Sequence, residues 1–334
     1  MSRDIAMALK ILQEASTWII LSHVRPDGDT LGSASALIAM GKNLGKNCFW
    51  LGPDSIPENL LFLPYAEEYR NTLKALPRDL PGHVCLVALD ISHESRCLQE
   101  ALDLRKDREY PLVVLDHHGD NSLFGDYHVI DSRASATAEI IHTLALQASW
   151  PLDKTAALGL YTGIVTDCGN FRYANTTPET HRITAHLLEL GVSPPEVEDS
   201  LNGHLSLGQM CIRGRALSRV QLCLDGKVAW SYVLQEDFSA TGTGKDHLEG
   251  LASQLLRLEG VDFSIFLYQD TPLLQGSLRS KGRINAQKIA QTQGGGGHPQ
   301  ASGFSTVYSL EETLQSLKEE LRRAYGEAGY PSLT

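Results

Sequence analysis

The fold of this chain is decided by the stretch Pro111-Leu-Val-Val-Leu115-Asp116-His117-His118-Gly119-Asp120. Its apolar half has the length and continuity of a strand that is buried on both faces of a parallel sheet. Its polar half begins where the strand ends, at the edge where open α/β sheets bind ligands. Because such a polar triplet can also be purely structural, its meaning depends on whether other elements end in the same way.

Three further elements of the chain end in side chains of the same chemical kind. They are residues 18–22, followed by His23-Val-Arg-Pro-Asp27-Gly-Asp29, residues 84–89, followed by Asp90, and residues 161–166, followed by Asp167. Asp27 and Asp29 would repel each other strongly unless a cation neutralised them. Capping of the next helix at Thr30 is the alternative. It explains Asp29 but leaves His23 and Asp27 without a role.

Asp90 and Asp167 stand at positions that are costly for a carboxylate. Asp90 ends a wholly apolar strand, and its alternative role is to cap the next helix. Asp167 ends a helix, where a negative charge opposes the helix dipole. Imidazoles and carboxylates without thiolate favour Mn²⁺, with Mg²⁺ or Fe²⁺ as alternatives, over a structural zinc site. The four motifs supply more ligands than one catalytic metal takes, so we expect two divalent ions, about 3.5–4 Å apart, that share a carboxylate and hold a hydroxide.

The order of the expected elements predicts an α/β protein of two lobes. Residues 1–190 alternate strands and helices, which is typical of a doubly wound, mainly parallel sheet. Residues 191–199, with two prolines and three acids, suggest a connection, and 191–220 is expected to be a linker with a connecting helix. Residues 221–330 predict a smaller α/β lobe. The expected strands are 18–22, 47–51, 84–89, 112–115, 127–130, 228–234, 263–268 and 276–279, and the expected helices 31–44, 94–105, 135–148, 154–166, 177–190, 207–220, 246–257, 285–291 and 310–324.

The second lobe carries features that suit a phosphate. Gly294-Gly295-Gly296-Gly297 would let backbone N–H groups approach an anion, and His298 could donate a hydrogen bond to it. Arg279 ends a strand and could bind phosphate or stack on a base. A flexible hinge is the alternative for the glycines. In the first lobe, Arg133 lies past the fifth strand, near the ligand-binding edge, and is a secondary candidate, because the pattern slightly favours an ordinary surface arginine.

Composition limits the class of protein. The chain has 334 residues, 42% of them apolar and 21% charged, and a formal net charge of −11. That charge argues against a binder of long duplex nucleic acid. No apolar run approaches the roughly 20 residues of a membrane span. The six cysteines form no CxxC pair, so we expect reduced thiols and a cytoplasmic protein.

At this point the residues resemble a known family. The patterns HxxPDGDxxGS, the isolated strand-end Asp90, DHH at 116–118 and TDCGNFRY from Thr166 look like the four motifs of the DHH phosphoesterase superfamily. GGGGHPQASGF from Gly294 looks like the signature of the accompanying DHHA1 domain. The resemblance covers almost the whole chain. Within the superfamily, the two-lobed chain looks most like NrnA-type bacterial oligoribonucleases and 3′-phosphoadenosine 5′-phosphate (pAp) phosphatases.

The resemblance implies a role for each site residue. His23 and Asp27 would hold one metal, Asp29, His117 and Asp167 the other, and Asp90 would bridge them. His118 would contact the substrate phosphate, and Asp116 would orient the histidines. Arg279 and His298, with Gly295, Gly296 and Gly297, would hold the distal phosphate or base. Relatives of this type are often homodimers.

The expected activity is therefore metal-dependent hydrolysis of short oligoribonucleotides, linear dinucleotides such as pApA and pGpG, or pAp to mononucleotides. A cyclic di-AMP phosphodiesterase is one alternative. A single-strand exonuclease resembling RecJ is another, but the chain is acidic and has no room for an added strand-binding domain. A nucleotide-binding protein with an inactive metal site would have lost ligands, and all six are present.

Overall fold

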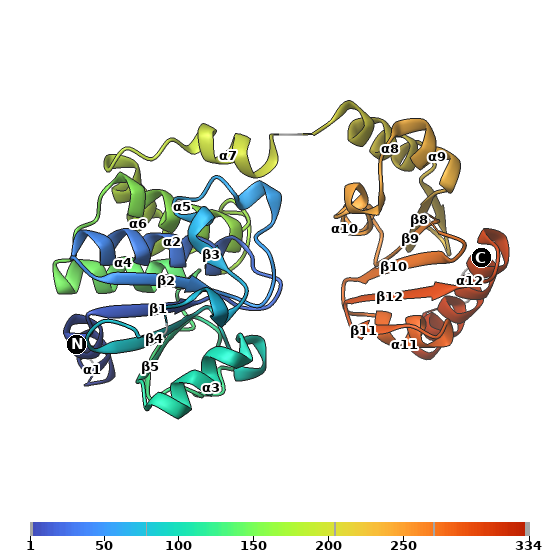
Figure 1. Cartoon of the computed structure of the whole chain (residues 1–334). Helices are drawn as coiled ribbons and strands as arrows, with labels where there is room; N and C mark the ends of the chain where they lie inside the picture. The colour runs from blue at the N-terminus through green and yellow to red at the C-terminus, as the bar shows by residue number, and fades with distance from the viewer. Residues whose placement is uncertain (1–2, 78, 204, 270, 331–334) are drawn as a thin grey trace. The chain divides into compact units, whose positions relative to one another are not determined.

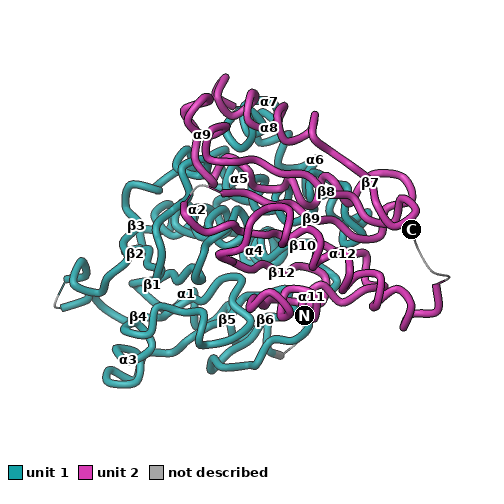
Figure 2. Tube along the Cα trace, turned by 90° about the vertical axis from the view of Figure 1, so that its right-hand side faces the viewer, with its two compact units in different colours: residues 1–204 teal, residues 205–334 magenta. Residues whose placement is uncertain are grey.

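The computed structural model describes residues 3–77, 79–203, 205–269 and 271–330. The chain forms two compact units, residues 1–204 and 205–334, each with its own sheet (Figures 1 and 2). The predicted α/β class, with a doubly wound parallel sheet and a smaller α/β domain, is confirmed. Within the described residues, no helix combines the length and apolarity needed to cross a membrane.

The first unit is built on a six-stranded sheet in which every pair of neighbours is parallel. Its strands are β1 (Thr17–Leu21), β2 (Asn47–Leu51), β3 (Tyr69–Arg70), β4 (Val84–Leu89), β5 (Leu112–Asp116) and β6 (Tyr127–Ile130). The order β3-β2-β1-β4-β5-β6 reverses direction between β1 and β4. In an open α/β sheet that reversal opens a crevice at the carboxyl ends of the two strands.

Helices cover both faces of this sheet, which is why its central strands β1, β4 and β5 are buried along their whole length. Trp18 and Ile20 of β1 pack against one helical layer, and Ile19 and Leu21 pack against the other. Figure 1 shows α3 on one side of the sheet and α2, α4, α5 and α6 on the other. The helices are α1 (Arg3–Glu14), α2 (Gly28–Asn43), α3 (Gln99–Arg108), α4 (Thr137–Ala148), α5 (Lys154–Asp167), α6 (Pro178–Glu189) and α7 (Pro194–Asn202), with 3₁₀ turns η1 (Glu58–Leu60), η2 (Ala66–Glu68), η3 (Leu73–Ala75) and η4 (Glu94–Arg96).

Two of the predicted segments have a different local structure. The expected helix 94–105 is a 3₁₀ turn followed by α3, because Cys97 and Leu98 are extended and interrupt it. The segment 191–220 contains α7, in the first unit, and a separate helix in the second. Pro194 and Pro195 occupy the first turn of α7, where a missing N–H costs no hydrogen bond.

The second unit contains a mixed six-stranded sheet in the order β11-β12-β10-β9-β8-β7, with only β8 and β9 parallel among the described pairs. Its strands are β7 (Gln221–Cys223), β8 (Val228–Val233), β9 (Phe263–Tyr268), β10 (Leu274–Ser280), β11 (Gly296–His298) and β12 (Ala301–Thr306). Its helices are α8 (Leu207–Ser218), α9 (Gln235–Thr241), α10 (Leu251–Leu255), α11 (Ala286–Thr292) and α12 (Leu310–Glu327), with the 3₁₀ turn η5 (Lys245–Leu248).

The two faces of the second sheet are covered differently. Apolar side chains of β8 to β10 and of Phe304 pack with α11 and α12 on one face. On the other face α8, α9, η5 and α10 pack mainly over β8 and β9. The expected helix 246–257 is broken at Gly250, whose φ of +80° ends η5 and starts α10.

Candidate metal centre

The predicted ligands gather at the reversal point of the first sheet, because β1 and β4 end there side by side. His23 follows β1, and Asp27 and Asp29 stand at the start of α2. Asp27 is the N-cap of that helix, and its Oδ1 accepts hydrogen bonds from the N–H groups of Asp29 (3.1 Å) and Thr30 (3.2 Å). The capping role that the sequence offered to Asp29 therefore belongs to Asp27.

Asp29 is instead held by the N-terminus of α4. Its Oδ2 accepts from the N–H of Thr137 (2.6 Å), and its Oδ1 accepts from the N–H of Ala138 (3.0 Å) and the hydroxyl of Ser33 (3.2 Å). Unpaired N–H groups at a helix start favour a carboxylate in that position. The side chain is 1% exposed, so it is fixed in orientation before any ligand arrives.

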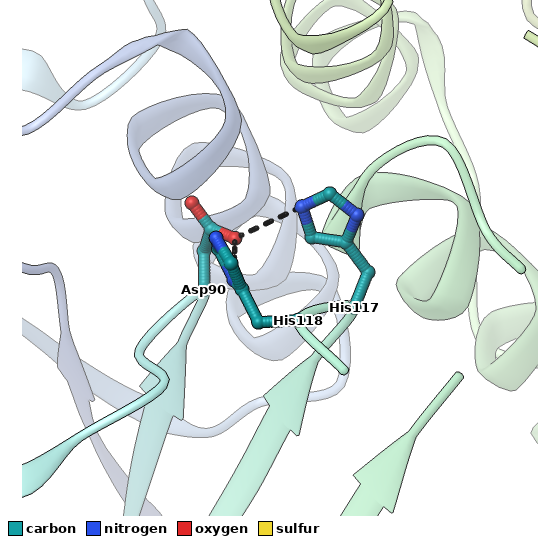
Figure 3. A group of neighbouring side chains, drawn as sticks. All are labelled: Asp90, His117 and His118. Carbon is teal, nitrogen blue, oxygen red and sulfur yellow. Dashed lines mark ion pairs between the residues drawn. The ribbon is translucent and has the colours of Figure 1, made fainter. Parts of the chain in front are cut away.

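Asp90 lies at the centre of the site. It follows β4 with a left-handed φ of +61°, a conformation that asparagine and aspartate tolerate better than other non-glycine residues. Its Oδ2 is 3.3 Å from Nε2 of His23, and its Oδ1 is 3.5 Å from both Nε2 of His117 and Nδ1 of His118. Figure 3 shows the His117 and His118 imidazoles converging on this one carboxylate.

Three groups of side chains are close enough to share a cation. They are His23–Asp27–Asp90, Asp29–His117–Asp167 and Asp90–His117–His118, each with candidate ligand atoms within 4.8 Å of one another. All six residues predicted as metal ligands therefore lie together. Asp90 belongs to two of the groups, and its two oxygens face different histidines.

Backbone carbonyls orient two of the histidines. Nδ1 of His23 lies 2.8 Å from the carbonyl oxygen of Val24, and Nδ1 of His117 lies 3.3 Å from that of Ala134. A carbonyl can only accept, so Nδ1 carries the proton in both rings. Nε2, the nitrogen that is left to bind a metal, therefore faces the carboxylates in both rings, which is the orientation that a metal-binding histidine needs.

Asp116 connects the two histidines that follow it. Its Oδ1 accepts from Nδ1 of His118 (2.7 Å) and from the N–H of His117 (2.8 Å), and its Oδ2 accepts from Nδ2 of Asn121 (2.5 Å). The side chain is fully buried and is absent from all three candidate cation groups. Its contacts suit a residue that positions His118, whose Nε2 is left facing outward.

Asp167 enters the site from the C-terminus of α5. Close packing of α2 and α5 brings it near Asp29, because Gly32, Gly159 and Gly163 remove side chains from that contact. Its Oδ2 is 3.5 Å from Nε2 of His117. Two neighbours of this site had no signal in the sequence. Asn175 donates to the carboxylate and backbone oxygen of Asp167, and Arg96 approaches Nδ1 of His23 at 3.3 Å.

The electrostatics of the site favour a bound cation. Burial, together with the charges of Asp90 and Asp167, holds the pKa of Asp29 well above its usual range. Burial also raises the pKa of Asp167 to about 6. Burial alone would lower the pKa of His23, but hydrogen bonds to Asp27 and Asp90 raise it to about 10. Carboxylates that are forced to hold protons, with oxygen and imidazole donors and no thiolate, fit a hard or borderline divalent ion.

The predicted phosphate ligands of the second unit lie on the part of its sheet that helices leave open. Arg279 of β10 is opposite Ala301 of β12, which is opposite His298 of β11, so all three point to one face. His298 is exposed and Arg279 is half-buried. This row places a guanidinium and an imidazole two strands apart.

The glycine run has a more specific structure than an open anion cradle. The N–H groups of Gly294 and Gly295 donate to the carbonyls of Gln291 and Ala290 at the end of α11. A Cβ on Gly295 would lie 2.2 Å from the Gly303 carbonyl oxygen, and Gly297 has a φ of +136°. Gly294 and Gly295 therefore end a helix, and Gly295 also packs against β12, which leaves Gly296 and Gly297 beside His298.

Arg133 lies past β6 at the same sheet edge as the metal site. Its side chain is 89% exposed and forms two hydrogen bonds with the Asp131 carboxylate, 3.0 and 3.1 Å long. It belongs to none of the candidate cation groups. A substrate phosphate would have to compete with Asp131 for this guanidinium.

Family models match both units. The model of the DHH family, N-terminal domain, matches residues 17–164, and that of the DHHA1 domain matches residues 225–327. A "Bifunctional oligoribonuclease and PAP phosphatase NrnA" of Thermus thermophilus is 37% identical over 313 residues, which is 91% of this chain and 90% of that protein. The chain belongs to the DHH phosphoesterase family.

Two further proteins match this chain over nearly its whole length. The protein of the same name in Bacillus subtilis is 29% identical over 312 residues, 91% of this chain and 93% of its own length. A crystal structure of an exopolyphosphatase-related protein from Bacteroides fragilis superimposes with a TM-score of 0.82 at 24% identity, over 99% of this chain and 100% of that one. The last likeness establishes the fold alone. DHH phosphoesterases are metal-dependent hydrolases, and the donor groups described above fit that requirement.

Proposed function

We propose that this DHH phosphoesterase uses two divalent metal ions, Mn²⁺ in the first place, to hydrolyse short oligoribonucleotides and pAp to mononucleotides. The observation that carries the proposal is the pair of ligand groups, His23–Asp27–Asp90 and Asp29–His117–Asp167, joined through Asp90. The activities printed for the Thermus and Bacillus relatives support the substrate class.

Charge balance supports two ions rather than one. Asp27, Asp29, Asp90 and Asp167 together offer four carboxylates, and two divalent cations would carry the matching charge. When bound, such ions polarise a phosphoryl oxygen and lower the pKa of an attacking water. Asp29 and Asp90 are buried and pre-oriented, so they lose little side-chain freedom on binding.

His118 is proposed to contact the substrate rather than a metal, and Asp116 is proposed to position His118. The short hydrogen bond from Nδ1 of His118 to Asp116 leaves Nε2 as the free nitrogen of a ring that is 36% exposed. That nitrogen can donate a hydrogen bond to a non-bridging phosphate oxygen. Asp116 fixes the ring, and Asn121 in turn fixes Asp116.

In the second unit, we assign the distal phosphate or base to Arg279 and His298, with Gly296 and Gly297 beside them. The support is the shared row across β10, β12 and β11 and the absence of a covering helix there among the described residues. Gly295 is assigned a structural role, because β12 leaves no room for a side chain. Arg133 stays a secondary candidate in the first unit.

The purified protein with Mn²⁺ should convert 5′-pApA and pAp to AMP. Chromatography of the reaction mixture measures the AMP that is released. Asp90→Asn should abolish both activities, because asparagine tolerates the left-handed backbone but removes the shared charge. Asp107→Asn, on an exposed acid of α3, is the matched control and should keep full activity. Failure of the wild-type protein to release AMP from either substrate would refute the proposal.

Two alternative activities are tested by the same assay. Cyclic di-AMP that is cleaved faster than pApA would favour a cyclic dinucleotide phosphodiesterase. Equal rates on a dinucleotide and a 30-nucleotide strand would favour a processive exonuclease. We expect the rate to fall steeply with strand length.

We further propose that the protein is a cytoplasmic homodimer. The cytoplasmic assignment is supported by six cysteines that form no disulfide. The dimer rests on the family resemblance. Light scattering after gel filtration measures the mass directly, and a mass of 36.6 kDa would exclude a dimer.

A further inference from the structure

A cavity of about 510 Å³ lies in the second unit beside Arg279. Its floor comes from Phe266 and Tyr268 of β9 and from Ser277 and Arg279 of β10. Its wall comes from η5 and the start of α10, in the segment 245–253. A volume of this size is in the range of small-ligand sites.

Strand register explains why these side chains share one cavity. Ser277 is opposite Phe266, and Gln275 is opposite Tyr268, so alternate residues of β9 and β10 point to the same face. The break at Gly250 turns the chain, so that η5 and α10 form a wall rather than one continuous helix. An aromatic floor therefore meets a polar wall.

Four charged side chains line this cavity, and none is in an ion pair within the described part of the chain. They are Lys245, Asp246, Glu249 and Arg279. A cavity of equal volume in the first unit is different, because Arg133 is paired there with Asp131 and Arg182 with Glu179. Of these two cavities, the one in the second unit thus offers both signs of charge to a ligand without breaking an ion pair among the described residues.

The combination matches a nucleotide that presents N–H donors on its base. Guanidinium and ammonium groups bind phosphate. The ring of Tyr268 can pack against a base, and such stacking accepts any base. A carboxylate is selective, because guanine offers N1–H and N2–H side by side, whereas the single N–H of uracil lies between two carbonyls that a carboxylate repels.

We propose that this cavity is a base-reading site, in which Asp246 and Glu249 accept hydrogen bonds from the base while Arg279 and Lys245 hold a phosphate. The inference rests on the proposed function and deepens it, because it makes hydrolysis depend on the base. Substrates with guanine are preferred over substrates with uracil, and the two carboxylates cause the preference.

The test compares kcat/KM for 5′-pGpG and 5′-pUpU in the wild type, Asp246→Asn, Glu249→Gln and the double variant. The wild type should favour pGpG, and the double variant should lose about ten-fold of that ratio, the scale of one bidentate base contact. Glu259→Gln, on an exposed acid of the same unit outside the cavity, should keep the wild-type ratio. Equal melting temperatures of the variants would exclude an effect on folding.

Binding of GMP and UMP, measured by calorimetry without metal, separates this inference from the proposed activity. Loss of GMP affinity in the double variant supports the base-reading site even if the protein hydrolyses neither dinucleotide. An unchanged GMP to UMP ratio, or an increase in affinity for both nucleotides on removal of the acids, would overturn it. In the latter case the carboxylates only repel phosphate.

Discussion

The contact between α2 and α5 is the strongest structural constraint on the metal site, and Gly32→Ala tests it. A Cβ at this position would lie 2.3 Å from the carbonyl oxygen of Gly159 and 2.8 Å from the nitrogen of Gly163. Both are backbone atoms, so the helices must separate by about 1 Å. Overpacking of this kind costs about 1–3 kcal/mol. Alanine recovers about 1 kcal/mol through its better helix propensity, so we expect a net loss of up to about 2 kcal/mol in the free energy of unfolding.

Gly214→Ala is the matched control, because Gly214 lies inside α8 and a Cβ there meets nothing within 4 Å. It should raise stability by up to about 1 kcal/mol. Urea unfolding, with hydrogen exchange read separately in peptides of each unit, measures both effects. Gly32→Ala should also lower activity, since Asp29 and Asp167 are carried by the separated helices. If Gly32→Ala stabilised the protein as Gly214→Ala does, the close-packing argument would be wrong.

Three further predictions concern single side chains. Asp116→Asn should lower kcat by about 10- to 100-fold with the fold intact, because an amide cannot accept every hydrogen bond now made to Asp116, including that from His118; an unchanged kcat would contradict this. Burial lowers the pKa of His142 to about 4, so the unfolded chain takes up a proton before the folded one does as pH falls. The free energy of unfolding should therefore fall by about 3 kcal/mol between about pH 6.5 and pH 4. A His142→Gln variant whose urea midpoints keep the same pH dependence would refute this prediction. Burial would raise the pKa of Asp237, but hydrogen bonds from Arg219 and its neighbours lower it to about 2. This carboxylate should therefore contribute about 2 kcal/mol to the free energy of unfolding above pH 4, and that contribution is lost as pH falls toward 2. Asp237→Asn should remove this acid sensitivity, as measured by thermal unfolding.

Much of the first unit was predictable because its signals are local. The runs 47–51, 84–89 and 127–130 coincide with β2, β4 and β6. The signal is clearest for β4, because a strand buried along its whole length is continuously apolar. Helices α4 and α5 likewise begin within two residues of their predicted starts. Less regular segments were harder to predict. The 3₁₀ turn η4 and the three-residue strands β7 and β11 are too short to carry a periodic pattern. The alternating burial of β12 is not visible in its mostly small and polar residues.

The sequence by itself determined which residues gather at the candidate metal centre. Carboxyl ends of parallel strands meet at one edge, so His23, Asp90 and His117 had to converge once their strands were recognised. Only the tertiary structure decided how each group is held: Asp27 caps α2, and the N-terminus of α4 fixes Asp29. It also decided that Gly294 and Gly295 end α11 and that Gly295 packs against β12, and it placed charges without an ion pair among the described residues around a cavity beside Arg279. The reason is physical, because a strand's end is written in its own residues, whereas hydrogen-bond partners and cavities depend on which elements pack together.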